Sequence, residues 1–128
     1  MPENIFNIGI MAQPEYRKRT IAIARGEYTP AEHEPKIWFE SLQSMAQVLS
    51  NENQKLLKII IDKQPQSLTE LETLSGRSKS NLSRTLKTLE HYGIVETHKN
   101  ARHLIPTVKA TDFRIEFGLG SSEDIGLN

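Results

Sequence analysis

The sequence predicts a mainly α-helical fold with a small β-hairpin, an α+β class. Two observations support this. Leucines recur at helical spacing in two short segments that meet at Gly76, and the pattern becomes extended directly after Gly93. Two helices joined by a tight turn and followed by a hairpin are typical of a winged helix-turn-helix. We expect three parts, an N-terminal arm and helix over 1–35, the winged helix-turn-helix over 36–117, and a flexible tail over 118–128.

The composition is that of an ordinary one-domain globular chain. Its 128 residues are 37% hydrophobic and 25% charged, and 16 Lys and Arg balance 16 Asp and Glu. Zero net charge gives no field over the whole molecule that would attract nucleic acid or a membrane, so any binding signal must be local. The chain has no cysteine, and no apolar run approaches the roughly 20 residues that a membrane span needs. We therefore expect a cytoplasmic protein without membrane contact.

The N-terminal half predicts an arm, two helices and a connector. Residues 1–13 show no sustained period and are expected to form an arm or one short strand. A helix is predicted from Pro14 to a cap at Gly26, because proline suits the first helical turn and glycine the end. Residues 27–35 form a connector. The helix from Pro14 is an N-terminal helical extension of the winged helix-turn-helix. A second helix is predicted over 36–49 from apolar residues that share one face, namely Ile37, Trp38, Leu42, Met45, Ala46 and Leu49.

Three further helices are expected, each with a residue that can cap its start and a proline or glycine at its end. Ser67 and Glu70 have capping-box spacing, in which the hydroxyl and the carboxylate each accept a backbone N–H. The last helix runs over about 78–92 and turns Leu82, Leu86 and Leu89 inward. The predicted caps are Ser50 or Asn51, Ser67 and Ser78, and the predicted ends are Pro65, Gly76 and Gly93.

Extended segments follow the last helix. Two short runs of β-forming residues flank a polar stretch, which predicts a hairpin, or wing, over about 94–109. Pro106 cannot donate to a ladder, so the second strand is expected at an edge or interrupted there. Phe113, Ile115 and Phe117 alternate with charged residues and indicate one more half-buried strand.

Positive charge is concentrated on the last helix and the hairpin. From Arg77 to Lys109 there are seven cations and two anions, a net charge of +5, so the remainder of the chain carries −5. In a winged helix these are the elements that face DNA phosphates. The local charge therefore favours binding of double-stranded DNA.

With the leucines turned inward, the polar face of the helix over 78–92 would enter the major groove. Short side chains allow close approach, an amide suits adenine and a guanidinium suits guanine, so we predict base contacts for Ser80, Asn81 and Arg84. Arg77 has an alternative role, which is to hold the turn by bonding a helix C-terminus. The residues predicted to contact phosphate are Arg77, Lys79, Ser83, Lys87, Lys99, Asn100 and Arg102.

The stretch SLTELETLSGRSKSNLSRTLKTLEHYGIVETHKN resembles the DNA-binding core of MarR-type winged-helix regulators, with a match over roughly residues 52–109. Those regulators show a leucine-rich helix, a glycine turn, a Ser/Thr-rich recognition helix and a wing. The resemblance implies a transcriptional regulator, most simply a repressor. The chain is also similar to small predicted MarR-like proteins often encoded beside toxin-like genes. This implies an alternative, an antitoxin that binds a protein toxin and autoregulates its operon.

The length after the wing bears on assembly. MarR-type regulators place dimerising helices on both sides of the winged helix, whereas about eleven residues follow Phe117 here. A homodimer would therefore form through the N-terminal part, with the 36–49 helix and the segment before it as candidates. Two-fold symmetry favours an inverted-repeat operator.

Catalytic and metal-binding patterns are absent from the sequence. There is no glycine-rich phosphate loop, nucleophile elbow or HExxH motif. His91, His98 and His103 have irregular spacing without cysteine beside them, which does not favour a metal site. We expect no enzymatic activity, no cofactor and no bound metal.

Overall fold

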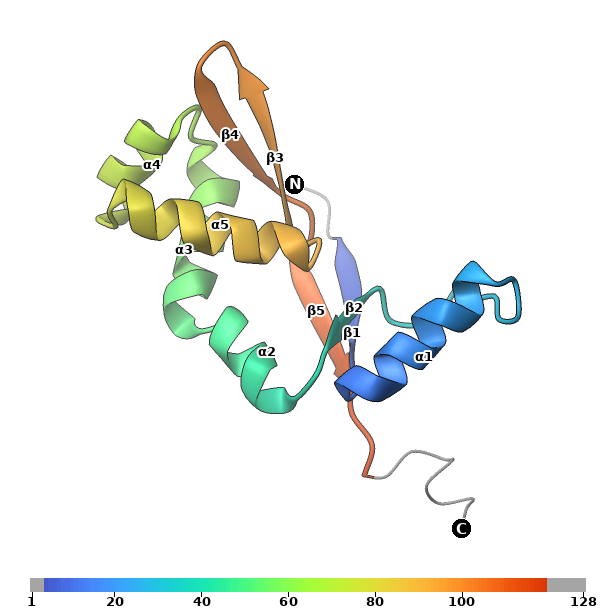
Figure 1. The fold of residues 1–128 in the computed structure, drawn as a ribbon. Coiled ribbons are helices and arrows are strands. Elements are labelled where there is room, and N and C mark those ends of the chain that lie inside the picture. The colour runs from blue at the N-terminus through green and yellow to red at the C-terminus, as the bar shows by residue number, and fades with distance from the viewer. Residues whose placement is uncertain (1–3, 120–128) are drawn as a thin grey trace.

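The computed structural model describes residues 4–119, which fold into a five-helix body with two small sheets (Figure 1). Of the predicted tail over 118–128, residues 120–128 lie outside the described range. In chain order the elements are β1 (Ile5–Ile10), α1 (Gln13–Ala24), β2 (Ile37–Phe39), α2 (Leu42–Val48), α3 (Asn51–Lys63), α4 (Leu68–Ser75), α5 (Lys79–His91), β3 (Val95–Asn100), β4 (His103–Val108) and β5 (Asp112–Glu116).

A parallel three-stranded sheet is the feature that the sequence did not reveal. Its order is β2-β1-β5, so β1 is the central strand, and Ile8 lies opposite both Ile37 and Ile115. β1 precedes residue 36 while β2 and β5 follow it, so the sheet joins the N-terminal segment to the rest of the fold. The predicted helical N-terminal extension is therefore incomplete, and the class is α/β, with a parallel sheet in addition to the hairpin.

The predicted helix over 36–49 is wrong in its first half. Ile37–Phe39 forms β2, in which Ile37 and Phe39 are buried and Trp38 points to the opposite face. α2 starts only at Leu42, after Ser41 accepts the Ser44 N–H at 3.0 Å. The β-forming run Ile-Trp-Phe finds a partner in β1, and this tertiary pairing outweighs the local helical spacing.

The other helix boundaries confirm the predicted caps. Ser50, Ser67 and Ser78 each accept a backbone N–H from the first turn, and Gln64, just before Pro65, ends α3 in a left-handed conformation. The Glu70 carboxylate accepts the Gln66 N–H at 2.7 Å, which completes a variant of the predicted capping box. The inner face of the parallel sheet packs with α3, α4 and α5 around a core of buried aliphatic side chains.

The hairpin and the last strand are also confirmed. β3 and β4, called the wing below, pair antiparallel, and Thr97 lies opposite Pro106 in a sheet whose two strands are both edges. β5 is a strand, but only Phe113 packs against the core. Ile115 and Phe117 remain 50% and 51% exposed, so the expectation of a half-buried strand holds only for the start of β5.

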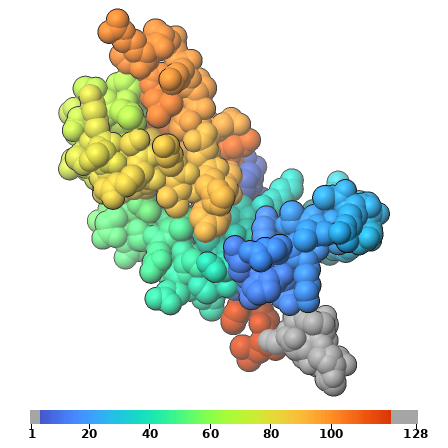
Figure 2. Space-filling view, viewed as in Figure 1, coloured from blue at the N-terminus to red at the C-terminus, as the bar shows by residue number. Residues whose placement is uncertain are grey.

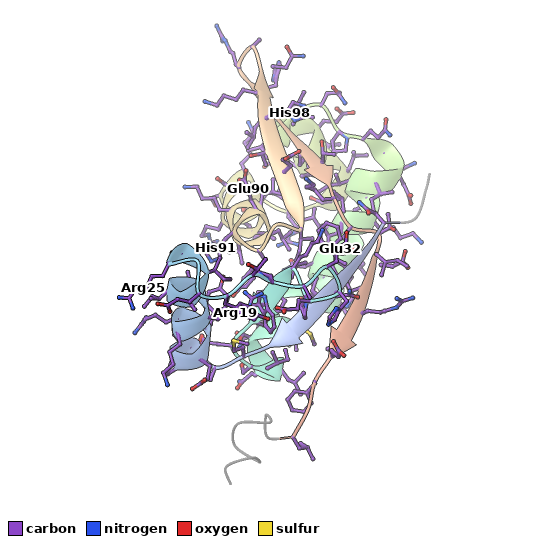
Figure 3. The ribbon with its side chains drawn as sticks, turned by 90° about the vertical axis from the view of Figure 1, so that its right-hand side faces the viewer. Arg19, Arg25, Glu32, Glu90, His91 and His98 are labelled. Atoms are coloured by element: carbon purple, nitrogen blue, oxygen red, sulfur yellow. The ribbon has the colours of Figure 1, made fainter. Side chains whose placement is uncertain are left out.

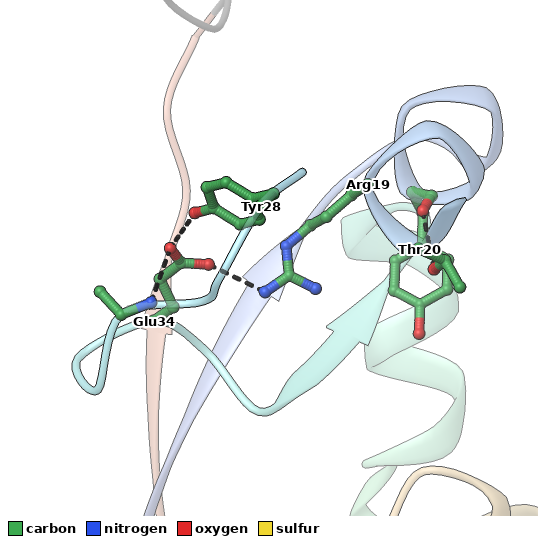
Figure 4. A network of polar contacts seen from close by, with 6 residues as sticks. Arg19, Thr20, Tyr28 and Glu34 are labelled. Carbon is green, nitrogen blue, oxygen red and sulfur yellow. Dashed lines mark hydrogen bonds and ion pairs between the residues drawn. The ribbon is translucent and has the colours of Figure 1, made fainter. Parts of the chain in front are cut away.

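α1 is attached to the sheet by a polar cluster rather than by a buried face (Figure 4). Arg19 Nη2 bonds Glu34 Oε1 at 2.8 Å, and the Tyr28 hydroxyl and the Ala31 N–H donate to the other carboxylate oxygen. The guanidinium carbon of Arg19 lies 4.9 Å from the ring centre of Trp38. The hydrogen bond from Tyr28, followed by that from Arg19, lowers the pKa of Glu34 from 4.5 to about 2.

The single tryptophan makes this cluster measurable. A carboxylate with a lowered pKa stabilises the fold above its unfolded pKa of 4.5, and this contribution is lost as pH falls toward about 2. We expect Trp38 fluorescence to be constant from neutral pH to about 4.5 and to change between there and about 2, because Arg19 loses its anchor beside the ring. Far-UV circular dichroism separates this change from global unfolding. Glu34→Gln should show the altered fluorescence already at neutral pH. If its fluorescence still changes between pH 4.5 and 2 as in the unmodified protein, Glu34 is not the group that titrates.

Gly9 is required by the close packing of Trp38 on the outer face of β1. A Cβ at this position would lie 2.7 Å from Trp38 Cε3 and 2.9 Å from Pro35 Cγ. We expect Gly9→Ala to lower the free energy of unfolding by about 1–3 kcal/mol through overpacking. Gly118→Ala is the matched control, because no atom lies within 4 Å of its Cβ. The free energies of unfolding are measured in urea. Equal values for the two variants would show that steric overlap at Gly9 does not destabilise the fold.

Candidate nucleic-acid interface

α5 separates an apolar face from a polar one. Leu82, Leu86 and Leu89 are at most 1% exposed and pack into the core, as the sequence predicted. The opposite side of the helix carries the predicted contact residues. Of these, Lys79, Ser80, Arg84 and Lys87 are exposed, while Asn81 and Ser83 are half-buried.

The turn between α4 and α5 is short and fixed. Gly76 ends α4 at φ 75°, a left-handed conformation that favours glycine, and its N–H donates to the Glu72 carbonyl at 2.9 Å. Two residues later, Ser78 begins α5 by accepting the Asn81 N–H at 3.2 Å. The two helices therefore form a helix-turn-helix pair with α5 on the outside (Figure 1).

Arg77, between those two caps, clamps α5 to α3. Its Nε donates to Asn81 Oδ1 at 2.7 Å, its Nη1 to Asn53 Oδ1 at 3.1 Å and its Nη2 to Thr85 Oγ1 at 2.8 Å. Asn53 also donates through Nδ2 to the Val48 carbonyl at 2.9 Å, which extends the network to the end of α2. Of the two predicted roles, this arrangement favours holding the turn, although the partners are side chains instead of a helix C-terminus.

The clamp changes what Asn81 can offer to a base. Bidentate recognition of adenine uses both the oxygen and the nitrogen of the amide. The Asn81 oxygen already accepts from Arg77, and the side chain is half-buried. Its amide nitrogen has no hydrogen bond within residues 4–119, so Asn81 presents a donor more readily than a bidentate pair.

Arg84 is the predicted base-reading residue with the freest side chain. It is exposed on the outer face of α5, and its Nε makes one long bond of 3.4 Å to the Ser80 carbonyl. Its terminal nitrogens make no bond to other described residues, which leaves the fork of the guanidinium available for a ligand.

The wing projects from the end of α5, with His98 on it in Figure 3. Lys99, Asn100 and Arg102 are all exposed at its tip, where Ala101 adopts φ 62° in the turn. At its base, the Thr97 hydroxyl donates to Glu90 Oε2 on α5 at 3.0 Å. This bond ties the wing to the helix.

Charge on this face remains uncompensated. Glu96 forms an ion pair with Lys109 at 3.6 Å, and Glu90 accepts from Thr97. The five cations on α5 and the wing tip form no ion pair with any residue from 4 to 119. They are Lys79, Arg84, Lys87, Lys99 and Arg102. In Figure 2, α5 and the wing form one continuous surface, coloured yellow to orange.

A metal site and a membrane-spanning helix were the other features sought among residues 4–119. Residues 4–119 contain no cluster of three His, Asp or Glu side chains that could hold a metal ion. Within the same range, no helix combines the length and the apolar character needed to cross a bilayer.

Residues 48–115 match the HVO_A0114 family. This match spans more than half of the 128 residues. The chain belongs to the HVO_A0114 family. The family region runs from the last residue of α2 to the penultimate residue of β5, so it includes the helix-turn-helix and the wing and leaves β1, α1 and β2 outside.

A solved structure is also similar to this family member. It is titled "Crystal structure of the predicted DNA-binding transcriptional regulator from E. coli", with a TM-score of 0.43 and 15% sequence identity over 77% of this chain and 85% of that chain. No curated protein matches the chain. The resemblance to MarR-type regulators and the antitoxin alternative stay predictions.

Arg77 has a role that lysine cannot take over in this family member. An ammonium is a single charged centre, so it cannot bond Asn81, Asn53 and Thr85 in the planar arrangement of the guanidinium. We expect Arg77→Lys to lower the free energy of unfolding by about 1 kcal/mol, because hydrogen bonds to part-buried polar partners are lost. Thermal and urea unfolding test this, with Arg84→Lys as the exposed control. Equal stability of the two variants would remove the structural role of Arg77.

Proposed function

We propose that this protein is a sequence-specific double-stranded DNA-binding transcriptional regulator that represses its target by occluding the promoter. The observation that carries the proposal is the unpaired positive charge on α5 and the wing tip. A recognition helix and a wing meet DNA on the same side of a winged helix, and phosphate neutralisation supplies most of the non-specific affinity. The chain as a whole is neutral, so this surface is a local attraction.

Specificity would arise near the start of α5. Ser80 is small and exposed, which allows the helix to approach the groove floor, and the Arg84 guanidinium is free to take a guanine edge bidentately. Asn81 would contribute its amide N–H while its oxygen stays on Arg77. Phosphate contacts would come from the flanking cations and hydroxyl or amide groups, namely Lys79, Ser83, Lys87, Lys99, Asn100 and Arg102.

Arg77 takes part in this proposal without touching DNA. Three of its five N–H donors are used within the protein, and its charge lies beside the first turn of α5. At 0.15 M salt, charges act over about 8 Å, so Arg77 adds to the attraction of phosphate near the helix start. The proposed operator is an inverted repeat bound by a homodimer, with half-sites about 34–36 Å apart or a multiple of this distance.

Base-reading and phosphate-binding residues are separable by experiment. Selection from a random duplex pool supplies the operator, and fluorescence anisotropy then measures affinity for it and for a scrambled duplex. We expect Arg84→Ala to cost about 1–3 kcal/mol on the operator and to relax one base position, whereas Lys99→Ala should weaken both duplexes alike. Lys99→Ala should also reduce the log-log salt slope by about 0.9.

Lys63→Ala serves as the control, because Lys63 is exposed at the end of α3, outside the proposed surface. If the pool yields no enriched sequence and no duplex binds at low salt, DNA binding is refuted. If Arg84→Ala loses the same affinity on operator and scrambled DNA, Arg84 belongs with the phosphate contacts.

A further inference from the structure

β5 is an edge strand with an unpaired outer side. In the order β2-β1-β5 its one strand partner is β1, and Figure 3 shows it as the outermost strand of the sheet. The Asp112 N–H donates to the Asn4 carbonyl at 3.2 Å, at the start of the β1 side. Backbone groups alternate in direction along a strand, so the N–H and C=O groups of Phe113 and Ile115 point outward. Such an edge is a template for another strand.

A groove of about 980 Å³ with a mixed apolar and polar lining lies beside this edge. Met45 of α2 and Leu49, directly after α2, contribute apolar side chains to it, as do Phe113 and Ile115 of β5. Ile115 is 50% exposed, and Phe117, which directly follows the end of β5, is 51% exposed. The edge and the groove therefore form one surface, with unpaired backbone groups next to unburied apolar side chains.

We propose that this surface is the seam of a homodimer, in which β5 pairs antiparallel with β5 of a second copy about a two-fold axis at Ile115. The pairing joins the two sheets into one six-stranded sheet. Phe117 of the second copy then lies opposite Phe113 on the groove side, and Ile115 faces its own symmetry mate. Apolar cross-strand pairs of this kind stabilise antiparallel sheets.

Charge complementarity supports a second copy as the occupant and excludes a register shifted by one residue. With the axis at Ile115, Arg114 lies opposite Glu116 of the second copy, and symmetry forms this pair twice. A shift of the axis by one residue, to Arg114, would oppose Arg114 to itself and Asp112 to Glu116, which is repulsive. Arg114 and Glu116 are exposed and form no ion pair within residues 4–119, so both are free to pair across the axis.

The seam adds to the proposed function the position of the two-fold axis. Only its consequence for the operator geometry rests on the proposed function. It uses α2, which lies in the segment 36–49 expected to dimerise, and it adds β5 from the C-terminal end. α1, the other N-terminal candidate, takes no part in it. The dimer is measured without DNA, so failure of the seam and failure of DNA binding are distinguishable.

Charge reversal across the axis tests the seam. Light scattering coupled to size exclusion should give twice the 14.6 kDa chain mass for the full chain. We expect Arg114→Glu and Glu116→Arg each to raise the dimer dissociation constant about tenfold or more, because two opposite-charge pairs become two like-charge pairs. The double variant Arg114→Glu/Glu116→Arg should return it to the original value. Lys63→Glu, an exposed reversal away from the seam, is the control.

Cross-linking tests the register independently of charge. The chain has no cysteine, so Ile115→Cys introduces a single thiol. Directly opposite residues in an antiparallel pair have Cα atoms about 4.5–5.5 Å apart, and a short bifunctional thiol reagent should link Ile115→Cys to itself. Lys63→Cys should stay unlinked under the same conditions.

The outcomes separate cleanly. Loss of the dimer in both single reversals, its recovery in the double variant and a cross-link at position 115 support the seam. A monomeric full chain, a dimer insensitive to both reversals, or no recovery in the double variant overturns it. Circular dichroism of each variant ensures that a change in mass is not caused by unfolding.

Discussion

The insertion of β1 between β2 and β5 is the constraint on which the rest of the structure depends. β1 and β5 pair along five positions although Ile5 and its partner Asp112 lie at opposite ends of the described chain. Closing so long a loop costs chain entropy, which burial of β1 side chains such as Ile8 offsets. The same insertion gives α2 and α3 a surface to pack on and leaves β5 at the edge. The free edge of β5 therefore follows from this strand placement.

The recognition helix is held from behind by two kinds of interaction. Leu82, Leu86 and Leu89 fix its depth in the core through non-directional burial, which by itself tolerates small rotations about the helix axis. The directional bonds of Arg77 to Asn81 and Thr85 remove that freedom, since they hold two successive turns. A base-reading side chain must keep its position to within about half an ångström. Under the proposed function, the clamp would thus contribute to specificity.

Local signals predicted most of the helices and the wing, and long-range pairing explains what they missed. Ser67 and Gly76 bound α4 through groups within a few residues, so the sequence was sufficient there. In Ile37–Phe39, a three-residue strand is too short for its period of two to stand out, and only pairing with β1 defines it. The bond between Arg77 and Asn53 spans 24 positions and obeys no period. The sequence predicted Arg77 either to contact phosphate or to hold the turn, and only this long-range contact favours the second role.

The connection between the wing and β5 determines how dimer geometry would reach DNA. Only residues 109–111 separate β4 from β5. The Lys109 N–H donates to the Ile94 carbonyl at 2.8 Å, and Asn4 and Thr111 exchange backbone and hydroxyl bonds of 2.7 and 2.9 Å. These bonds join the base of the wing, β1 and β5 into one unit without a flexible linker. A two-fold axis on β5 would then fix the separation of the two wings through the sheet itself, which favours one half-site spacing over a range of spacings.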